Sequence, residues 1–188
     1  MLVLKTFMGL LEKVMNRLEK LTNPLVVSKA FNAGMDAWLT PKSFSTGETF
    51  EAYVQKVLFV EAYYELLHRT RDYPTNHKRF VKSSLYPDFK FRDRCTKKEF
   101  YVEVKFRARD YNGKIEGCNP DQLRRHQEIH KKIPVFIALG IGGKPNHPEY
   151  ILLLPLNEAR YTGLYISLVH KFQIAPDKPV LSRILWNR

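Results

Sequence analysis

Cysteine is scarce in this chain, and long apolar runs are missing from it. The two cysteines, Cys95 and Cys118, form neither a CxxC pair nor a zinc-ligand spacing, so we expect free thiols in a reducing compartment. No stretch approaches the roughly 20 apolar residues of a membrane-spanning helix. Lys5, Glu12 and Lys13 interrupt the apolar start, which argues against a signal peptide. The sequence therefore predicts a cytoplasmic protein with no membrane partner.

Acidic residues are also few. The chain has 31 Lys and Arg against 19 Asp and Glu, a net charge of +12. Between residues 66 and 109 the excess is strongest, with thirteen basic and five acidic residues and a net of +8. A basic stretch of this kind is typical of proteins that grip a phosphate backbone. An acidic protein partner or a merely soluble basic surface remains an alternative on charge alone.

Two familiar motifs are incomplete. The stretch Gly140-x-Gly142-Gly143 lacks the full dinucleotide fingerprint, and Pro145 opposes an immediate helix, so no nucleotide cofactor is predicted. His126 and His130 lie four residues apart with Glu128 between them, which differs from the HExxH pattern of zinc peptidases. A surface or packed histidine pair is the simpler interpretation of these two. The chain also lacks internal repeats and low-complexity tails.

Two segments alternate like strands. In residues 99–107, Phe100, Val102 and Val104 point to one side, whereas Glu103 and Lys105 point to the other. Residues 86–91 alternate in the same way and carry Asp88. A hairpin that pairs Asp88 with Glu103 leaves residues 93–98 as its connection and places both acids on one face. A half-buried hairpin with a solvated charged face would show the same alternation.

The chemistry of these side chains suits hydrolysis of a phosphodiester. Asp88 and Glu103 offer hard oxygen ligands, which favour Mg²⁺, with Mn²⁺ as a substitute, over a soft-ligand zinc site. Lys105 beside them would help to deprotonate the attacking water or stabilise charge on the phosphorus. In a chain of this charge the expected substrate is DNA, and RNA is not excluded.

These residues also resemble a known family. Pro87-Asp88 and, fifteen residues on, Glu103-Val104-Lys105 are similar to the signature of the PD-(D/E)XK nuclease superfamily, which includes restriction enzymes and Holliday-junction resolvases. The helical pattern that Gly47 opens matches the first helix of many members. The segment around Gln122 and the apolar run 134–140 are similar to the helix and strand that follow in the junction resolvases. The resemblance covers residues 47–140.

The resemblance implies further roles. The carbonyl of Val104 would be a metal ligand, and Glu51 an outer one. Glu51 would also stabilise a helix N-terminus without any metal, and Glu48 competes for its role, although Ser45-x-x-Glu48 also reads as a capping box. Gln122 would orient the water or Lys105. The expected phosphate contacts are basic residues on the strands, the loop and the helix: Lys78, Arg79, Lys82, Lys90, Arg107, Arg109, Lys114, Arg124 and Arg125.

The expected fold is α/β, a restriction endonuclease-like core with a mixed sheet of four or five strands flanked by helices. We expect a helical hairpin in residues 1–42, packed on a nuclease domain in residues 43–188. Within that domain the pattern predicts a helix over 45–68, a strand near 79–83, a loop over 109–119, a strand over 150–155, and a further element within 164–174.

The predicted function is metal-dependent hydrolysis of DNA. The alternatives are a non-catalytic nucleic-acid-binding protein on the same scaffold and a structural protein with an incidental basic face. A homodimer would suit an enzyme that cuts both strands.

Overall fold

The computed structural model describes residues 42–70 and 85–187. The predicted helical hairpin in residues 1–42, the strand expected near residues 79–83, and Lys78, Arg79 and Lys82 therefore lie outside the described residues, apart from Lys42 itself. The chain divides into two units, residues 1–45 and 46–188, and the second carries the sheet described below.

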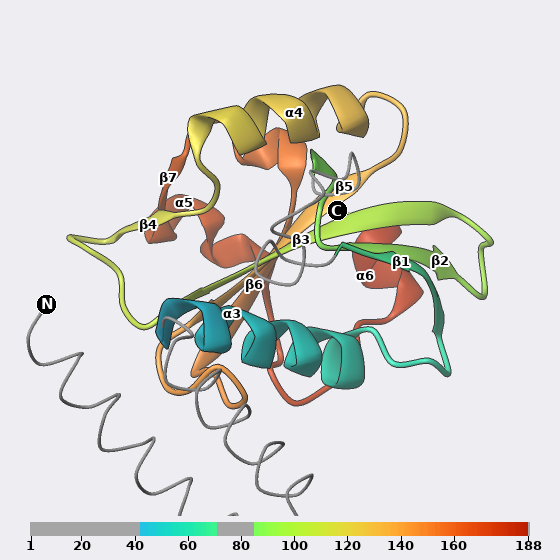
Figure 1. The fold of residues 1–188 in the computed structure, drawn as a ribbon, viewed down its shortest axis with the longest axis horizontal. Helices are drawn as coiled ribbons and strands as arrows, with labels where there is room; N and C mark the ends of the chain where they lie inside the picture. Colours follow the sequence, from blue (N-terminus) through green and yellow to red (C-terminus); the bar gives the residue numbers. More distant parts are fainter. Residues whose placement is uncertain (1–41, 71–84, 188) are drawn as a thin grey trace, which may run out of the picture. The chain divides into compact units, whose positions relative to one another are not determined.

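The second unit is built on a mixed β-sheet (Figure 1). In the described part of the chain its six strands follow the order β1 (Tyr64–Arg69), β2 (Phe89–Asp93), β3 (Glu99–Arg107), β5 (Val135–Ile141), β6 (Tyr150–Pro155) and β8 (Gln173–Ile174). Strands β3 and β5 run parallel, whereas the other neighbouring pairs are antiparallel. A small second sheet pairs β4 (Lys114–Glu116) with β7 (Gly163–Tyr165). The predicted α/β class with a mixed sheet is confirmed, with β8 as a short extra strand at one edge.

Helices flank both faces of this sheet (Figure 1). Their bounds are α3 (Lys42–Tyr53), the π-helix η1 (Val54–Leu58), α4 (Pro120–His130), the 3₁₀ turns η4 (Leu156–Glu158) and η5 (His170–Phe172), α5 (Ile166–Val169) and α6 (Ser182–Trp186). On one face, Phe50 of α3 and Leu58 of η1 pack with the apolar side chains of β2 and β3. On the other face, Leu123 of α4 packs with Ile137 and Leu139 of β5. This second face carries Glu103.

The predicted hairpin forms in the predicted register. Phe89 lies opposite Val102 and Arg92 opposite Glu99, so Asp88, one residue before the ladder, comes opposite Glu103. Phe91 and Phe100 are also paired, and both are buried in the apolar cluster beneath α3. A slip of one residue would have placed these rings on the face of the acids.

Two element predictions are wrong. The helix expected over residues 45–68 ends at Leu58, and residues 64–69 form strand β1 instead. Tyr64 explains the change: its ring is buried, and its hydroxyl donates to the carbonyl of Val180 over 2.9 Å. Pairing with β2 therefore stabilises residues 64–69 more than two further helical turns would. The loop expected over residues 109–119 contains strand β4, because it pairs with β7, which follows it by about fifty residues in sequence.

The glycines that resembled part of a nucleotide fingerprint have packing and turn functions. A Cβ on Gly140 would lie 2.5 Å from two ring carbons of Phe50, so only glycine lets α3 approach β5 here. Gly142 and Gly143 have φ values of +70° and +63°, in the left-handed region that glycine adopts without strain. The run thus packs against α3 and closes the β5–β6 connection.

Asp93 connects the β2–β3 turn to the C-terminal helix. One carboxylate oxygen accepts hydrogen bonds from the backbone N–H groups of Cys95 and Thr96, at 2.8 and 3.2 Å. The other accepts from the hydroxyl of Ser182 and from Nε1 of Trp186, the latter at 2.8 Å. Burial alone would raise the pKa of Asp93, but these four donors outweigh it and lower the pKa to about 2.

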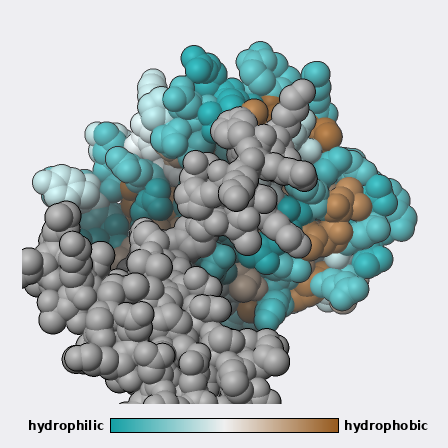
Figure 2. All heavy atoms as spheres, in the orientation of Figure 1, coloured by the Kyte–Doolittle hydropathy of each residue, from teal (hydrophilic) through white to brown (hydrophobic). Residues whose placement is uncertain are grey.

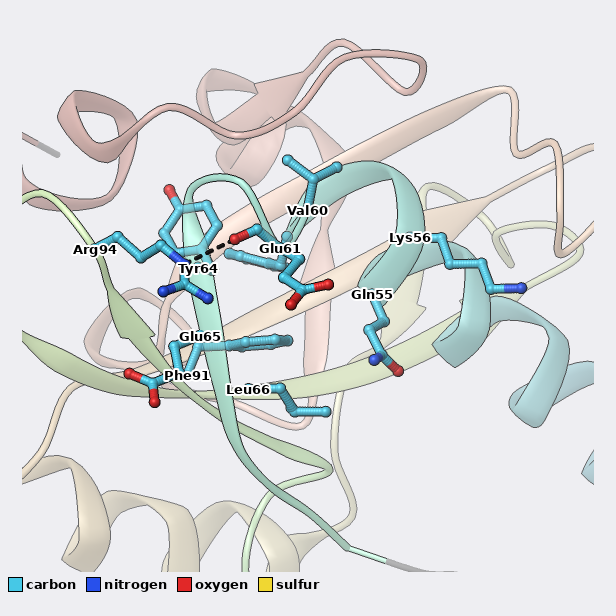
Figure 3. A pocket seen from close by; sticks show the side chains of 10 residues that line it. Gln55, Lys56, Val60, Glu61, Tyr64, Glu65, Leu66, Phe91 and Arg94 are labelled. Atoms are coloured by element: carbon cyan, nitrogen blue, oxygen red, sulfur yellow. Dashed lines mark hydrogen bonds between the residues drawn. The ribbon is translucent and has the colours of Figure 1, made fainter.

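On the face that Figure 2 shows, most of the coloured side chains are hydrophilic, with some hydrophobic ones among them. Among the described residues no helix is both long and apolar enough for a membrane span. A cavity of about 620 Å³ lies beside η1, β1 and β2 (Figure 3), where Nε of Arg94 donates to the carbonyl of Glu61 over 2.8 Å. None of the predicted site residues lines it.

Candidate active site

Three of the predicted site residues meet where β2 begins beside β3. Glu103 and Lys105 lie two apart on β3 and therefore share a face, and Nζ of Lys105 is 2.5 Å from Oε1 of Glu103. Asp88 precedes β2 and accepts a hydrogen bond from the backbone N–H of Val104, with 2.7 Å between N and Oδ2. The structure thus brings the Asp88, Glu103 and Lys105 side chains to one place.

The backbone before β2 is held by the end of β1. The N–H of Thr70 donates to the carbonyl of Asp88 over 2.8 Å, and its hydroxyl donates to the carbonyl of Pro87 over 3.0 Å. Both Thr70 and Pro87 are buried. The direction of the Asp88 carboxylate therefore depends on all three strands of the meander, β1 to β3.

Burial and neighbouring charges have opposing effects on the pKa values of Asp88 and Lys105. Burial first, and then the neighbouring charge of Glu103, raise the pKa of Asp88 well above its usual range, although Lys105 acts in the opposite direction. Burial would lower the pKa of Lys105, but the Glu103 and Asp88 carboxylates outweigh it and raise that pKa. The site thus holds an ammonium group near two acids whose negative charges repel each other.

Glu51 stands nearby on α3. It is buried, its Oε2 lies 3.1 Å from Nη2 of Arg69, and its charge adds to the rise in the pKa of Asp88 behind burial and Glu103. Helix α3 begins at Lys42, so Ser45 lies within the helix and does not begin the predicted capping box with Glu48. Of the two candidate acids, Glu51 is the buried one, and Glu48 is exposed.

Gln122 is the third residue of helix α4 and forms a capping box with Asn119. Its backbone N–H donates to Oδ1 of Asn119 over 2.8 Å, and its Oε1 accepts from the N–H of Asn119 at 3.5 Å. Pro120 occupies the first turn, where a missing N–H costs nothing. The side-chain oxygen of Gln122 therefore has a structural partner, and its catalytic role stays a prediction.

Two residues at this place were not predicted from the sequence. Cys118, in the loop before α4, and His126, on α4, are both buried beside Glu103. The Nε2 of His126 lies 3.8 Å from Oε2 of Glu103. The available signal was helical spacing, because Leu123, His126 and His130 at i, i+3 and i+7 lie on one helix face. His130 instead accepts a hydrogen bond from the N–H of Val135, at 3.0 Å.

The predicted phosphate contacts fall into two groups. Lys90 pairs with Glu99 at 2.7 Å and Arg124 with Asp121 at 3.1 Å. On α4, Arg125 is partly buried and its Nε has no hydrogen-bond partner among the described residues. The second group, Arg107, Arg109 and Lys114, lines one cavity of about 430 Å³ together with Tyr111. That cavity begins two residues beyond Lys105 on β3.

No protein-family model and no curated protein matches this sequence. Among solved structures the chain is similar to Archaeoglobus fulgidus Hjc, a Holliday junction resolvase from an archaeal hyperthermophile. The two are 14% identical with a TM-score of 0.42, over 59% of this chain and 82% of the resolvase. A likeness this distant establishes neither an activity nor a substrate for the present chain.

Proposed function

We propose that residues 43–188 form a metal-dependent nuclease domain that hydrolyses phosphodiester bonds of DNA. One observation carries the proposal: Asp88 and Glu103 converge from neighbouring strands, with Lys105 in contact with Glu103 at 2.5 Å. A structural protein has no need of two mutually repelling acids beside a partly buried ammonium. Burying such charges is costly unless a ligand uses them.

The residues fit a hard divalent cation. Asp88 and Glu103 supply carboxylate oxygens, the ligands that Mg²⁺ and Mn²⁺ prefer. The raised pKa of Asp88 reflects burial and crowding by negative charge, which a bound cation would offset. The N–H and C=O of one strand residue point to the same neighbouring strand, so the carbonyl of Val104 faces the side of Asp88, as its N–H does. Glu51 remains the candidate for an outer ligand.

When bound, the cation would polarise the phosphate and acidify the attacking water. The chain's own contribution is to position these groups. Asp88 is aimed by the N–H of Val104, and Glu103 by its ion pair with Lys105. Without the cation, the Glu103 and Asp88 carboxylates raise the pKa of Lys105, and its positive charge would stabilise negative charge on the phosphate.

The cavity that begins beyond Lys105 fits a nucleic-acid strand leaving the site. Arg107 follows Lys105 on the same face of β3, and Arg109 and Lys114 continue the positive charge. Tyr111 and Tyr165 flank Lys114, at 82% and 53% exposure, and the ammonium lies 5.8 Å from the ring centre of Tyr165. Exposed aromatic rings beside cations are the arrangement on which unpaired bases stack.

A second candidate function is nucleic-acid binding without cleavage. The charged cavity favours it independently of the carboxylates, because phosphate contact needs only Arg107, Arg109 and Lys114.

The discriminating experiment is cleavage of labelled duplex, flap, junction and single-stranded DNA, and of RNA, in Mg²⁺, Mn²⁺ or EDTA. The nuclease hypothesis requires metal-dependent products that Asp88→Ala and Glu103→Ala both abolish. Glu128→Ala is the matched control, because this exposed carboxylate on α4 pairs with Lys131, which follows that helix. Binding without products in every metal would leave the second candidate.

A further inference from the structure

We propose that Glu103, Cys118 and His126 form a buried site for a divalent cation of the zinc class. The three residues come from three separate parts of the chain: strand β3, the loop after β4, and helix α4. One ligand atom of each lies within 4.8 Å of the others. The side chains are 2%, 5% and 2% exposed, so solvent does not satisfy them.

The hydrogen bonding of His126 is the second observation that indicates a ligand. Its Nδ1 has no partner among the described residues, although the imidazole is buried. Its Nε2 faces Oε2 of Glu103 at 3.8 Å, which is too long for a hydrogen bond. Buried polar atoms without partners are uncommon and costly. A cation bound by one ring nitrogen of His126, by Sγ of Cys118 and by a carboxylate oxygen of Glu103 would give the imidazole a partner, while Glu103 also keeps its ion pair with Lys105.

The set of donors selects the kind of metal. Thiolate and imidazole are ligands that Zn²⁺ and Co²⁺ accept readily and that Mg²⁺ does not. Three protein ligands with one open position match the zinc sites that keep a water or a substrate. With metal–ligand bonds of about 2.0–2.3 Å, tetrahedral ligand atoms lie roughly 3.3–3.8 Å apart. The three ligand atoms, now within 4.8 Å of one another, would therefore have to move closer together by about 1 Å, which rotation of the side chains can supply.

This site would share Glu103 with the pair that we propose for Mg²⁺. A cation held by Cys118 and His126 draws Oε2 of Glu103 toward α4, away from Asp88. Zinc would then compete with the catalytic cation, and Mg²⁺-dependent cleavage would fall as zinc is added. This consequence rests on the proposed nuclease function, whereas zinc binding itself does not.

Binding is tested on the full chain without nucleic acid. Titration with Co²⁺ should produce the near-ultraviolet absorption of a thiolate–cobalt bond, and Zn²⁺ should displace it. Cys118→Ser should abolish the band. His126→Gln should weaken metal affinity at least tenfold. Cys95→Ser is the matched control, because Cys95 is the exposed second thiol of the chain and should leave the band unchanged. No band in the wild type, or a band that depends on Cys95, would overturn the site.

Folding and cleavage are followed separately. Circular dichroism of each variant, with Cys118→Ala as a second substitution, shows whether the fold is kept, and a folded Cys118→Ala protein that still gives the band contradicts the proposal. If the wild type gives the band but never cleaves DNA, the zinc site stands and the nuclease proposal fails. If the wild type cleaves, zinc must inhibit it and Cys118→Ser must relieve the inhibition at least tenfold. If zinc inhibits the wild type and Cys118→Ser equally, the proposal that the two metal sites share Glu103 is wrong.

Discussion

The backbone N–H of Val104 donates to Oδ2 of Asp88 over 2.7 Å, one residue along β3 from Glu103. The two acids of the site are therefore linked through the backbone of a single strand, and their separation follows from the β2–β3 register. A divalent cation would find these two ligands already placed, with little conformational entropy left to lose.

Because of this hydrogen bond, two substitutions of Asp88 distinguish the effect of its charge from the effect of its position. Asp88→Asn keeps an oxygen for the Val104 N–H but removes the charge, whereas Asp88→Ala removes both. We expect either variant to lose metal-dependent cleavage by about a hundredfold or more. Without metal, Asp88→Asn should unfold at a temperature equal to or above that of the wild type, because the pKa of Asp88 is raised by burial and by Glu103. Single-turnover assays and thermal melts in EDTA measure the two effects, and unchanged cleavage by Asp88→Asn would refute the role of the charge.

Lys105 separates a catalytic site from an incidental metal site. Lys105→Met keeps much of the aliphatic volume and leaves Asp88 and Glu103 in place, so calorimetry should show Mn²⁺ binding equal to or tighter than that of the wild type. Cleavage should nevertheless fall by about two orders of magnitude, the usual scale for losing a charge-stabilising group. Lys131→Met is the matched control, because Lys131 is exposed and lies just after α4. Full cleavage by Lys105→Met would contradict our mechanism even if the protein is a nuclease.

Gln122 has two candidate roles, and a comparison with Asn119 distinguishes them. Both residues form the capping box of α4, and Asn119→Ala removes the better cap acceptor, at 2.8 Å. If Gln122 also orients the water or Lys105, Gln122→Ala should slow cleavage about tenfold while destabilising the protein less than Asn119→Ala, for which we expect a loss of about 1 kcal/mol. Urea unfolding and cleavage rates are the measurements. Equal effects of the two variants on cleavage would leave Gln122 as a cap alone.

The lowered pKa of Asp93 predicts that the stability of the protein depends on pH in the acid range. Its pKa in the folded protein is about 2, below the ordinary value of 3.8, because its hydrogen bonds outweigh burial. The unfolded state therefore binds the proton first as the pH falls. The stabilisation is fully present above about pH 4 and is lost between pH 4 and 2. Asp93→Asn should lower the free energy of unfolding by about 1–3 kcal/mol at pH 7, and the difference from the wild type should shrink below pH 4. Urea titrations along a pH series test this, with Asp121→Asn, on the surface of α4, as the control.

The sequence predicted the parts of this fold that repeat a local pattern. The alternation around Asp88 and Glu103 contained enough information for the hairpin register, because a slip would have exposed Phe91 and Phe100. The apolar run predicted at residues 134–140 likewise corresponds to β5 (Val135–Ile141), which is buried along its whole length. Strand β1 was missed because its pattern is also compatible with a helix. Partners distant in sequence fix the place of Tyr64, among them the carbonyl of Val180 and the ring of Phe100.

The same limit explains the site residues that the sequence did not reveal. Cys118 and His126 are eight residues apart, and no local pattern relates them to Glu103. They meet it because α4 packs over the face of the sheet that carries Glu103, which is a property of the tertiary structure. Conversely, Lys90 and Arg124 were predicted as phosphate contacts from their charge alone, and each pairs with a nearby carboxylate.

The cavity lined by Arg107, Arg109 and Lys114 allows the contributions of charge and of base stacking to be measured separately. In EDTA, which blocks cleavage, Arg107→Ala and Arg109→Ala should weaken DNA binding and reduce the slope of log affinity against log salt by about 0.7 each on single strands.

Tyr111→Ala and Tyr165→Ala should weaken single-strand binding by about 1–3 kcal/mol per stacked base without changing that slope. They should affect blunt duplex DNA much less, because paired bases cannot stack on the rings. Tyr63→Ala is the matched control, since Tyr63 is similarly exposed at 46% but lies before β1, away from this cavity. Fluorescence anisotropy at several salt concentrations measures all five variants, and equal losses on duplex and single strands would refute the stacking role of the tyrosines.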